Sequence, residues 1–239
     1  MPRAVERASS RSTCLLHLSD MQRIIAAATL FGTVSAASFG PIVSLPGWNM
    51  STPVMHSGYL PIPGTQRALF GWFVESMSTT AATDPLVLWT NGGPGCSSLS
   101  GGLLSEQGPI RPDPSGSGNL VPNPWTWALS ANILFLESPA GVGFAYSNVS
   151  ADYTVGDERT AADTVAAIVA FLQLYPQYAS NPFYLSGESY SGHYTLMGAR
   201  AVIASNAAGV NPKINFKGFL VGNAWTDAGI DNTGCLEHW

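Results

Sequence analysis

The sequence is poor in charge, and its charges form no pattern that would assign it to several common protein classes. Only 10% of its 239 residues are charged, and the net charge is −5. The basic residues gather in no patch, so nucleic-acid binding lacks the electrostatic footprint that it requires. No apolar run reaches the roughly 18 residues that a membrane-spanning helix needs. The chain is 46% hydrophobic, which predicts a globular protein of one domain or most of one.

Cysteine is also scarce, and its positions give no metal site. The three cysteines are Cys14, Cys96 and Cys235, and their spacing matches no metal-binding motif. A Cys96–Cys235 disulfide is arithmetically available, but the sequence alone cannot establish the pairing. The chain also lacks internal repeats and long low-complexity tracts, so a repeat architecture is not indicated.

The N-terminal region has the features of a targeting signal. In residues 21–36, Arg23 precedes a short apolar core, Ile24–Val34, and Ala36 supplies a small residue near its end. This arrangement is typical of a secretory signal peptide, with an N-terminal amphipathic helix as the alternative. Residues 1–20 are expected to be an unstructured leader or the result of a misassigned start.

Two possible glycosylation sites agree weakly with passage through the secretory pathway. Asn49 and Asn148 each begin an Asn-X-Ser triplet, the acceptor sequence for N-linked glycans. We therefore expect a vacuolar, lysosomal or extracellular location, and the sequence does not distinguish among these compartments.

The segment Phe183–His193 combines a short apolar run, a turn and the start of a helix around one serine. Gly187 ends the apolar run, and Ser189 lies between Gly187 and Gly192. Strand, tight turn and helix around a lone serine form the pattern of a nucleophile elbow, in which small neighbours relieve steric clashes. The alternative is an ordinary strand-to-helix connection that happens to contain serine and glycine.

The rest of the chain supplies further strands and helices. Ser57–Ile62 and Ala68–Ser76 flank the turn residues Pro63-Gly64-Thr65 and predict a β-hairpin. Continuous apolar runs predict buried strands, and helical spacing of apolar residues predicts helices. The strands are expected at Leu86–Thr90, Ile133–Leu136 and Phe216–Val221. Helices are expected over Tyr194–Ile203 and from near Thr154 and Asp157, whose spacing suits an N-terminal cap, to Pro176. A hairpin followed by such alternation predicts an α/β-hydrolase-type, mostly parallel sheet.

A glycine-rich loop, Asn91-Gly92-Gly93-Pro94-Gly95, follows one of the predicted strands. Glycines allow backbone amides to approach a substrate closely, and such a loop often provides one oxyanion donor beside the amide that follows the nucleophile. Read alone, the loop is a plain turn. Together with the elbow at Ser189, it predicts an oxyanion hole.

Four segments in this order resemble the serine carboxypeptidases: Asn91–Leu99, Glu137–Phe144, Gly187–Gly192 and Gly222–Asp227. The resemblance extends from about Ser44 to Asp231, within a partial α/β-hydrolase domain at residues 37–239. It implies release of single C-terminal residues from peptides or proteins through an acyl-enzyme, without a metal or an organic cofactor. Ser189 would be the nucleophile, and the amides of Gly93 and Tyr190 would form the oxyanion hole.

The resemblance also implies a site for the C-terminal carboxylate of the substrate. Asn91 and Glu188 would bind that carboxylate, and Glu106 would hydrogen-bond Glu188. Two glutamates held close together raise one pKa, so the pair can keep a proton at mildly acidic pH. We therefore expect substrate binding to weaken as the pH rises past neutral.

The general base is harder to assign. Among the four histidines, His17 lies in the leader, His56 precedes the hairpin and His193 is expected to pack beneath the elbow. Only His238 has the expected chain order, but Asp227 and Asp231 precede it by eleven and seven residues, too few for a strand-helix-strand excursion. A local triad is therefore not expected.

In the family that this chain resembles, the catalytic aspartate and histidine lie far C-terminal of the serine. The chain is accordingly expected to be the N-terminal half of a carboxypeptidase, from an incomplete gene model, a fragment or an alternative transcript. The partner of Cys96 would also lie beyond Trp239. A half-sheet of this kind is expected to leave an unpaired edge and exposed apolar surface.

Two alternatives to a carboxypeptidase stay open. One is an acyltransferase of the same family, in which an alcohol captures the acyl-enzyme. The other is a non-catalytic secreted binding protein. The carboxylate-binding residues favour the peptidase, and the oligomeric state is left undetermined.

Overall fold

The computed structural model describes residues 39–238, with side chains to residue 234. The predicted leader, the predicted signal peptide, and the side chains of Cys14, His17, Cys235 and His238 lie outside this part. One sheet dominates the fold, with strand order β1-β2-β3-β7-β4-β9-β10 and β8 paired to β3. Its strands are β1 (Phe39–Pro41), β2 (Met55–Pro61), β3 (Arg67–Val74), β4 (Leu86–Thr90), β7 (Asn132–Glu137), β8 (Tyr146–Ser147), β9 (Phe183–Glu188) and β10 (Phe216–Gly222).

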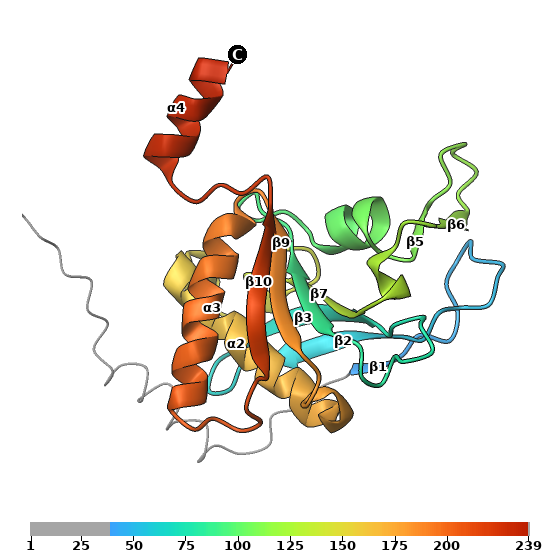
Figure 1. The fold of residues 1–239 in the computed structure, drawn as a ribbon, viewed down its shortest axis with the longest axis horizontal. Helices are drawn as coiled ribbons and strands as arrows, with labels where there is room; N and C mark the ends of the chain where they lie inside the picture. Colours follow the sequence, from blue (N-terminus) through green and yellow to red (C-terminus); the bar gives the residue numbers. More distant parts are fainter. Residues whose placement is uncertain (1–38, 239) are drawn as a thin grey trace, which may run out of the picture.

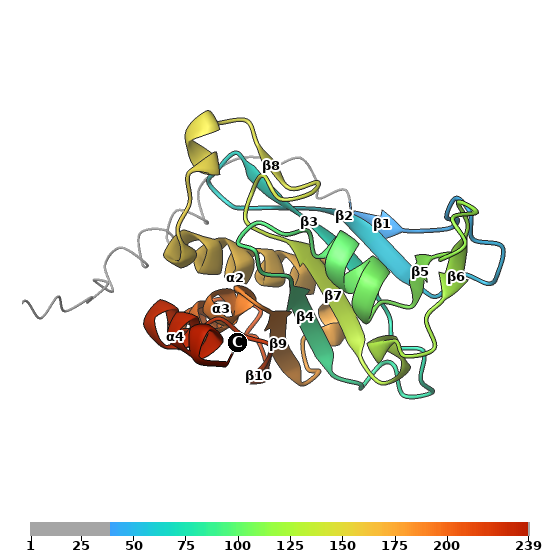
Figure 2. The ribbon, with the colours of Figure 1, turned by 90° about the horizontal axis from the view of Figure 1, so that it is seen from above.

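Helices cover both faces of this sheet. Helices α2 (Asp157–Leu174) and α3 (Ser191–Ala207) lie on one face, and an irregular helical segment, Leu99–Glu106, lies on the other (Figures 1 and 2). A small ribbon of β5 (Ile110–Pro112) and β6 (Leu120–Pro122) flanks this segment. Short helical turns occupy Trp127–Leu129, Ser150–Tyr153 and Pro176–Tyr178, and α4 (Ala228–His238) projects away from the sheet (Figure 1).

Strand β4 shows why the sheet is covered on both faces. All five of its residues are buried. Leu86 and Leu88 face the core under α2 and α3, whereas Val87 and Trp89 face the core under Leu99–Glu106. Alternate side chains of a strand point to opposite faces, so a continuous apolar run requires a cover on each side.

The pairing pattern confirms the predicted hairpin and the predicted parallel region. Strands β2 and β3 are antiparallel. The pairs β7–β4, β4–β9 and β9–β10 are parallel. The observed strands agree with the predicted ones to within about two residues at each end, which is the usual uncertainty of such boundaries. Strands β1 and β8 and the segment Leu99–Glu106 were not predicted, because they are short or lack helical apolar spacing.

The predicted cap of the first long helix was wrong. Helix α2 begins at Asp157 after Gly156, and no side chain caps it. Thr154 instead belongs to the extended approach, and Asp157 lies in the first turn, where a negative charge is favourable. Its predicted end is confirmed, because α2 stops at Leu174 before Pro176.

Strand β10 is the C-terminal edge of the sheet in the described part of the chain. Phe219, Leu220 and Val221 are 46%, 48% and 37% exposed. Strands of parallel sheets are usually buried on both faces, so this exposure is unusual. The expected open edge with exposed apolar surface is therefore present within residues 39–238. No helix in this region is long and apolar enough to cross a membrane.

A buried ion pair connects the start of β3 to α2. Arg67 donates from Nε and Nη2 to the two carboxylate oxygens of Asp163, at 2.7 and 2.9 Å, and from Nη1 to Asp152 at 3.1 Å. Asp163 is only 3% exposed. Burial raises the pKa of the Asp163 carboxyl, and the Arg67 guanidinium opposes that rise. Asp163 therefore depends on Arg67 for its charge-assisted hydrogen bonds, because its burial leaves almost no contact with water.

Arg67→Met should lower the free energy of unfolding by about 3–5 kcal/mol, because it leaves Asp163 buried without its partner. The double variant Arg67→Met/Asp163→Leu should recover most of this loss. Urea unfolding followed by tryptophan fluorescence measures both effects. Arg200→Met, at an exposed position of α3, is the control and should change stability by less than about 0.5 kcal/mol. Equal losses in the single and double variants would contradict the explanation.

Candidate active site

Ser189 occupies a strained turn between β9 and α3. Its φ angle is 61°, in the left-handed region that residues other than glycine seldom adopt. The turn is held by hydrogen bonds from the Ser189 amide to Gly222 O at 3.0 Å and from the Trp225 amide to Ser189 O at 2.8 Å. A strained serine between a parallel strand and a helix is the geometry of a nucleophile elbow.

Small residues around Ser189 make this turn possible. A Cβ atom at Gly187 would overlap Ser191 Oγ and lie 2.5 Å from Thr90 O. A Cβ atom at Gly192 would lie 2.5 Å from Trp225 O. The Ser191 hydroxyl also pairs with Thr90 Oγ1 at 2.6 Å, which ties the first turn of α3 to the end of β4. A larger residue at Gly187 would push β9 away from α3 and β4, and one at Gly192 would push α3 away from the segment that follows β10.

The glycine-rich loop packs directly against this elbow. A Cβ atom at Gly92 would collide with the Tyr190 amide nitrogen and would lie 2.7 Å from Glu188 O. Gly93 follows with φ of 105°, a conformation that glycine adopts without strain. The structure therefore brings the loop and the Tyr190 amide together, as an oxyanion hole requires.

Tyr190 and His193 form an aromatic stack beside the elbow. Their rings lie 4.8 Å apart at 28°, and the Tyr190 hydroxyl points to the Asp157 carboxylate at 3.2–3.3 Å. Burial, with the nearby charge of Asp157, raises the pKa of Tyr190. His193 is half-buried in this stack, in agreement with the packing role predicted for it.

Three contacts fix the side chain of Asn91. Its Oδ1 accepts hydrogen bonds from Trp89 Nε1 at 2.8 Å and from the Gly102 amide at 2.9 Å. Its Nδ2 donates to Glu106 Oε1 at 3.1 Å. Because Gly101 would place a Cβ atom 2.6 Å from Asn91 Nδ2, this close packing requires glycine there.

Glu106 and Glu188 are close enough for the charge of Glu106 to act on Glu188. Burial is the main cause of a raised pKa at Glu188, and the charge of Glu106 raises it further. The predicted hydrogen bond between the two carboxylates stays a prediction, because it requires a proton that they share. The structure instead shows Glu106 bonded to Asn91.

An open cleft of about 440 Å³ joins most of these residues. Its lining includes Asn91, Gly93, Glu188 and Ser189, together with Cys96, Ser97, Ser100 and Gly101. Cys96 is exposed and carries a free thiol. The predicted nucleophile, one predicted oxyanion donor and two predicted carboxylate-binding residues thus share one cavity, which is large enough for a small ligand.

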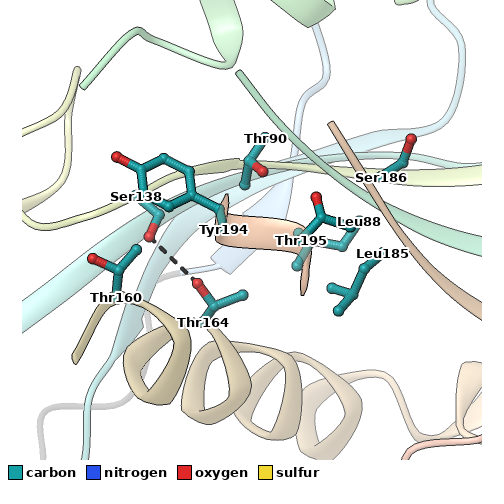
Figure 3. Close-up of a pocket in the computed structure, with 9 residues that line it drawn as sticks. All are labelled: Leu88, Thr90, Ser138, Thr160, Thr164, Leu185, Ser186, Tyr194 and Thr195. Atoms are coloured by element: carbon teal, nitrogen blue, oxygen red, sulfur yellow. Dashed lines mark hydrogen bonds between the residues drawn. The ribbon is translucent and has the colours of Figure 1, made fainter. Parts of the chain in front are cut away.

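A second, much smaller cavity lies beneath the elbow (Figure 3). It measures about 10 Å³ and is enclosed by β4, β9, α2 and α3. Seven of its nine lining residues carry a hydroxyl group, and Ser138 and Thr164 are bonded at 3.4 Å. Burial raises the pKa of Tyr194, another lining residue, to about 12. The space suits about one water molecule and cannot hold a substrate.

The described side chains provide no base for Ser189. His56 bonds to Tyr175 at 2.8 Å, and His193 stacks on Tyr190. Asp227 and Asp231 cap the start of α4 by accepting backbone amides at 2.7–2.9 Å. Since α4 is continuous, Asp231 and residue 238 lie about two turns, or roughly 10 Å, apart along it. This spacing agrees with the rejection of a local triad.

The two predicted glycan acceptors lie within the described part of the chain. Asn49 and Asn148 are both exposed, as acceptors of glycans must be. Among residues 39–238, His, Cys, Asp and Glu form no cluster of three that could hold a metal ion.

The strained serine, the glycine-rich loop and the mixed sheet define a protein of the α/β-hydrolase fold class. The sequence model of the serine carboxypeptidase family matches residues 46–239. Serine carboxypeptidase 24 of Arabidopsis thaliana is 47% identical over 200 residues, which cover 83% of this chain and 43% of that protein. Serine carboxypeptidase-like 26 of the same plant is 48% identical over 202 residues, covering 83% and 44%.

A solved structure agrees with these matches. A prohormone-processing carboxypeptidase from Saccharomyces cerevisiae superposes with a TM-score of 0.63 at 27% identity, covering 72% of this chain and 39% of that one. The chain therefore belongs to the serine carboxypeptidase family and has its α/β-hydrolase fold. It spans less than half the length of these relatives.

Several supporting residues were not found from the sequence. Trp89, Gly101 and Gly102 fix Asn91, and Ser98 Oγ accepts the Asn91 amide at 3.1 Å. Glu137 contacts the same loop from β7. Ser98 and Glu137 lie in segments that carry the family resemblance, but those segments do not distinguish support of the loop from ordinary packing. Only the contacts between distant segments show which groups they bond.

Gly92→Ala should displace the loop from the elbow and lower the free energy of unfolding by about 1–3 kcal/mol, as overpacking does. Gly40→Ala is the matched control, because a Cβ atom there would meet nothing within 4 Å. Urea unfolding measures the stability of both variants. If Gly92→Ala were as stable as the control, the close approach of the loop to Ser189 would be refuted.

Proposed function

We propose that this chain carries the nucleophile, the oxyanion donors and the carboxylate-binding site of a serine-type carboxypeptidase. The observation that supports this proposal best is the shared cleft, which Asn91, Gly93, Glu188 and Ser189 all line. Substrates would be the C-termini of peptides or proteins. No metal or organic cofactor enters the proposed reaction.

In this mechanism Ser189 Oγ attacks the carbonyl carbon of the last peptide bond while a base removes its proton. The amides of Gly93 and Tyr190 donate to the oxygen as it becomes negative, which lowers the barrier because the donors are already in place. The C-terminal residue leaves, and water then hydrolyses the acyl-enzyme. The described side chains provide no base, so we propose that this chain alone is inactive.

Recognition of the C-terminal carboxylate distinguishes this activity from other acyl transfers. Asn91 Nδ2 can donate to the carboxylate, and a protonated Glu188 can donate as well. The raised pKa of Glu188 favours the protonated form at mildly acidic pH. An acyltransferase of the same family is the second candidate, but it gives these residues no role in recognising a peptide carboxylate.

The sequence features support a location in the secretory pathway. Residues 21–36 have the pattern of a signal peptide, and both sequons begin at exposed asparagines. We propose that Asn49 and Asn148 carry glycans in a vacuolar, lysosomal or extracellular protein.

A short peptide with a free C-terminus should bind this chain at pH 5 at least about tenfold more tightly than the same peptide amide, because the amide loses charge-assisted hydrogen bonds. Binding should weaken as the pH rises from 5 to 8, since Glu188 ionises above its raised pKa and then repels the carboxylate. Isothermal titration calorimetry measures both effects.

Glu188→Gln is the control for this pH dependence. It keeps a neutral donor and should bind the free acid with little change between pH 5 and 8. Equal affinity for acid and amide would overturn the proposed function. Binding to wild type that strengthens with pH would overturn the role of Glu188.

A fluorophosphonate probe should label Ser189 slowly and incompletely in the isolated chain, because a serine hydroxyl without a base is a weak nucleophile. Mass spectrometry of the labelled peptide measures the extent, with Ser189→Ala as the background and a full-length serine carboxypeptidase as the positive control. Stoichiometric labelling would contradict the inactivity of this chain, and it would also exclude a non-catalytic binding protein.

A further inference from the structure

Glu137 is a buried carboxylate at the end of β7, outside the predicted set of site residues. It is 0% exposed, and its partners are neutral donors. Oε1 accepts from Ser97 Oγ at 2.6 Å and from the Leu99 amide at 3.1 Å. Oε2 accepts from the Phe144 amide at 3.1 Å. A buried carboxylate is costly unless such donors satisfy it, so its position depends on these three bonds.

The surrounding chain is shaped to fit this carboxylate. Gly143 has a φ angle of 53°, and a Cβ atom there would overlap Glu137 Oε2. The 138–144 turn therefore wraps around the carboxylate with no room for another side chain. An apolar side chain that only filled space at position 137 would require neither a carboxylate there nor a glycine at position 143.

The bonds of Glu137 lead to the loop that carries the recognition groups. Leu99 begins the helical segment Leu99–Glu106, so the carboxylate lies at the positive end of that segment. The same segment supplies Gly102 and Glu106, whose bonds fix Asn91. Ser97 lies two residues after the glycine-rich loop, and its hydroxyl also accepts the Ser100 amide at 3.1 Å.

We infer that Glu137 is a positioning residue, which holds the loop 91–99 against the elbow through Ser97 and Leu99. This inference rests on the proposed function, because it gives the loop its role in binding a carboxylate and an oxyanion. Glu137 acts through Asn91 and Gly93 and does not touch the substrate. Loss of its bonds leaves the sheet intact but lets the loop move away from Ser189.

Glu137→Gln tests this role with almost no change in volume. Its amide nitrogen cannot accept a hydrogen bond, so the donors to one of the two Glu137 oxygens lose their acceptor. In hydrogen–deuterium exchange, amides of residues 91–99 should exchange about tenfold faster, the effect of losing a bond to a charged group. Exchange in β4 and α2 should stay unchanged.

Two further variants provide controls. Ser97→Ala removes one donor only and should produce a smaller change in the same loop. Glu75→Gln also removes a carboxylate, one that accepts Tyr178 Oη at 2.8 Å. It lies next to Val74, which pairs with Ile133 near the opposite end of β7. Glu75→Gln should therefore leave exchange in residues 91–99 unchanged.

Peptide binding supplies the functional measurement. Glu137→Gln should reduce the preference for the free acid over the amide about tenfold, the effect of losing one charge-assisted hydrogen bond at Asn91. Glu75→Gln should keep that preference even if it lowers the urea midpoint. A merely structural role for Glu137 would change the midpoint and leave the preference intact.

The outcomes separate this inference from the proposed function. If wild type shows no preference for the acid, the proposed function fails, and faster exchange in Glu137→Gln still establishes that Glu137 holds the loop. If exchange in residues 91–99 matches Glu75→Gln, the positioning role is overturned whatever the binding result. Should Glu137→Gln fail to fold, Ser97→Ala decides by the same measurements.

Discussion

The close contact between the Gly92 backbone and the turn at Ser189 is the constraint on which the whole site depends. A Cβ atom at Gly92 would collide with the Tyr190 amide, so two segments nearly a hundred residues apart in the sequence meet backbone to backbone. This contact requires glycine in the loop, a positive φ at Ser189 and small residues on both sides of the turn. Replacing any of these residues would move Ser189 away from the loop that carries Asn91 and Gly93.

The topology of the sheet explains why this contact forms where it does. Strand β4 lies between β7 and β9, and all three run parallel. The loops that follow them therefore emerge at the same edge, on either side of the point where the strand order reverses. Ligand sites of open α/β sheets form at such points, beyond the carboxyl ends of the strands. The cleft lined by Asn91 and Ser189 has this position.

Support for the site comes from three directions. Glu137 holds the loop from β7, the Leu99–Glu106 segment holds Asn91 from above the sheet, and Asp157 at the start of α2 contacts the Tyr190 hydroxyl. The charges involved are carboxylates that accept hydrogen bonds, and two of them lie at the N-terminal ends of helical segments. The site is thus built from backbone donors and fixed acceptors, which need little rearrangement when charge develops.

The sequence alone determined the strand-turn-helix around Ser189, the hairpin, the parallel region and the family. These features are local, because apolar runs, helical spacing and glycines at fixed offsets express short-range steric and burial requirements. The predicted cap of α2 was wrong, because the favourable spacing of Thr154 and Asp157 does not show where the extended chain ends and the helix begins. Only the tertiary structure decided that Asn91 donates to Glu106 and accepts from Trp89 and Gly102, and that Glu137 accepts from the loop. Those contacts join residues from separate strands, and their geometry follows from the register of the sheet, which no single segment of the sequence contains.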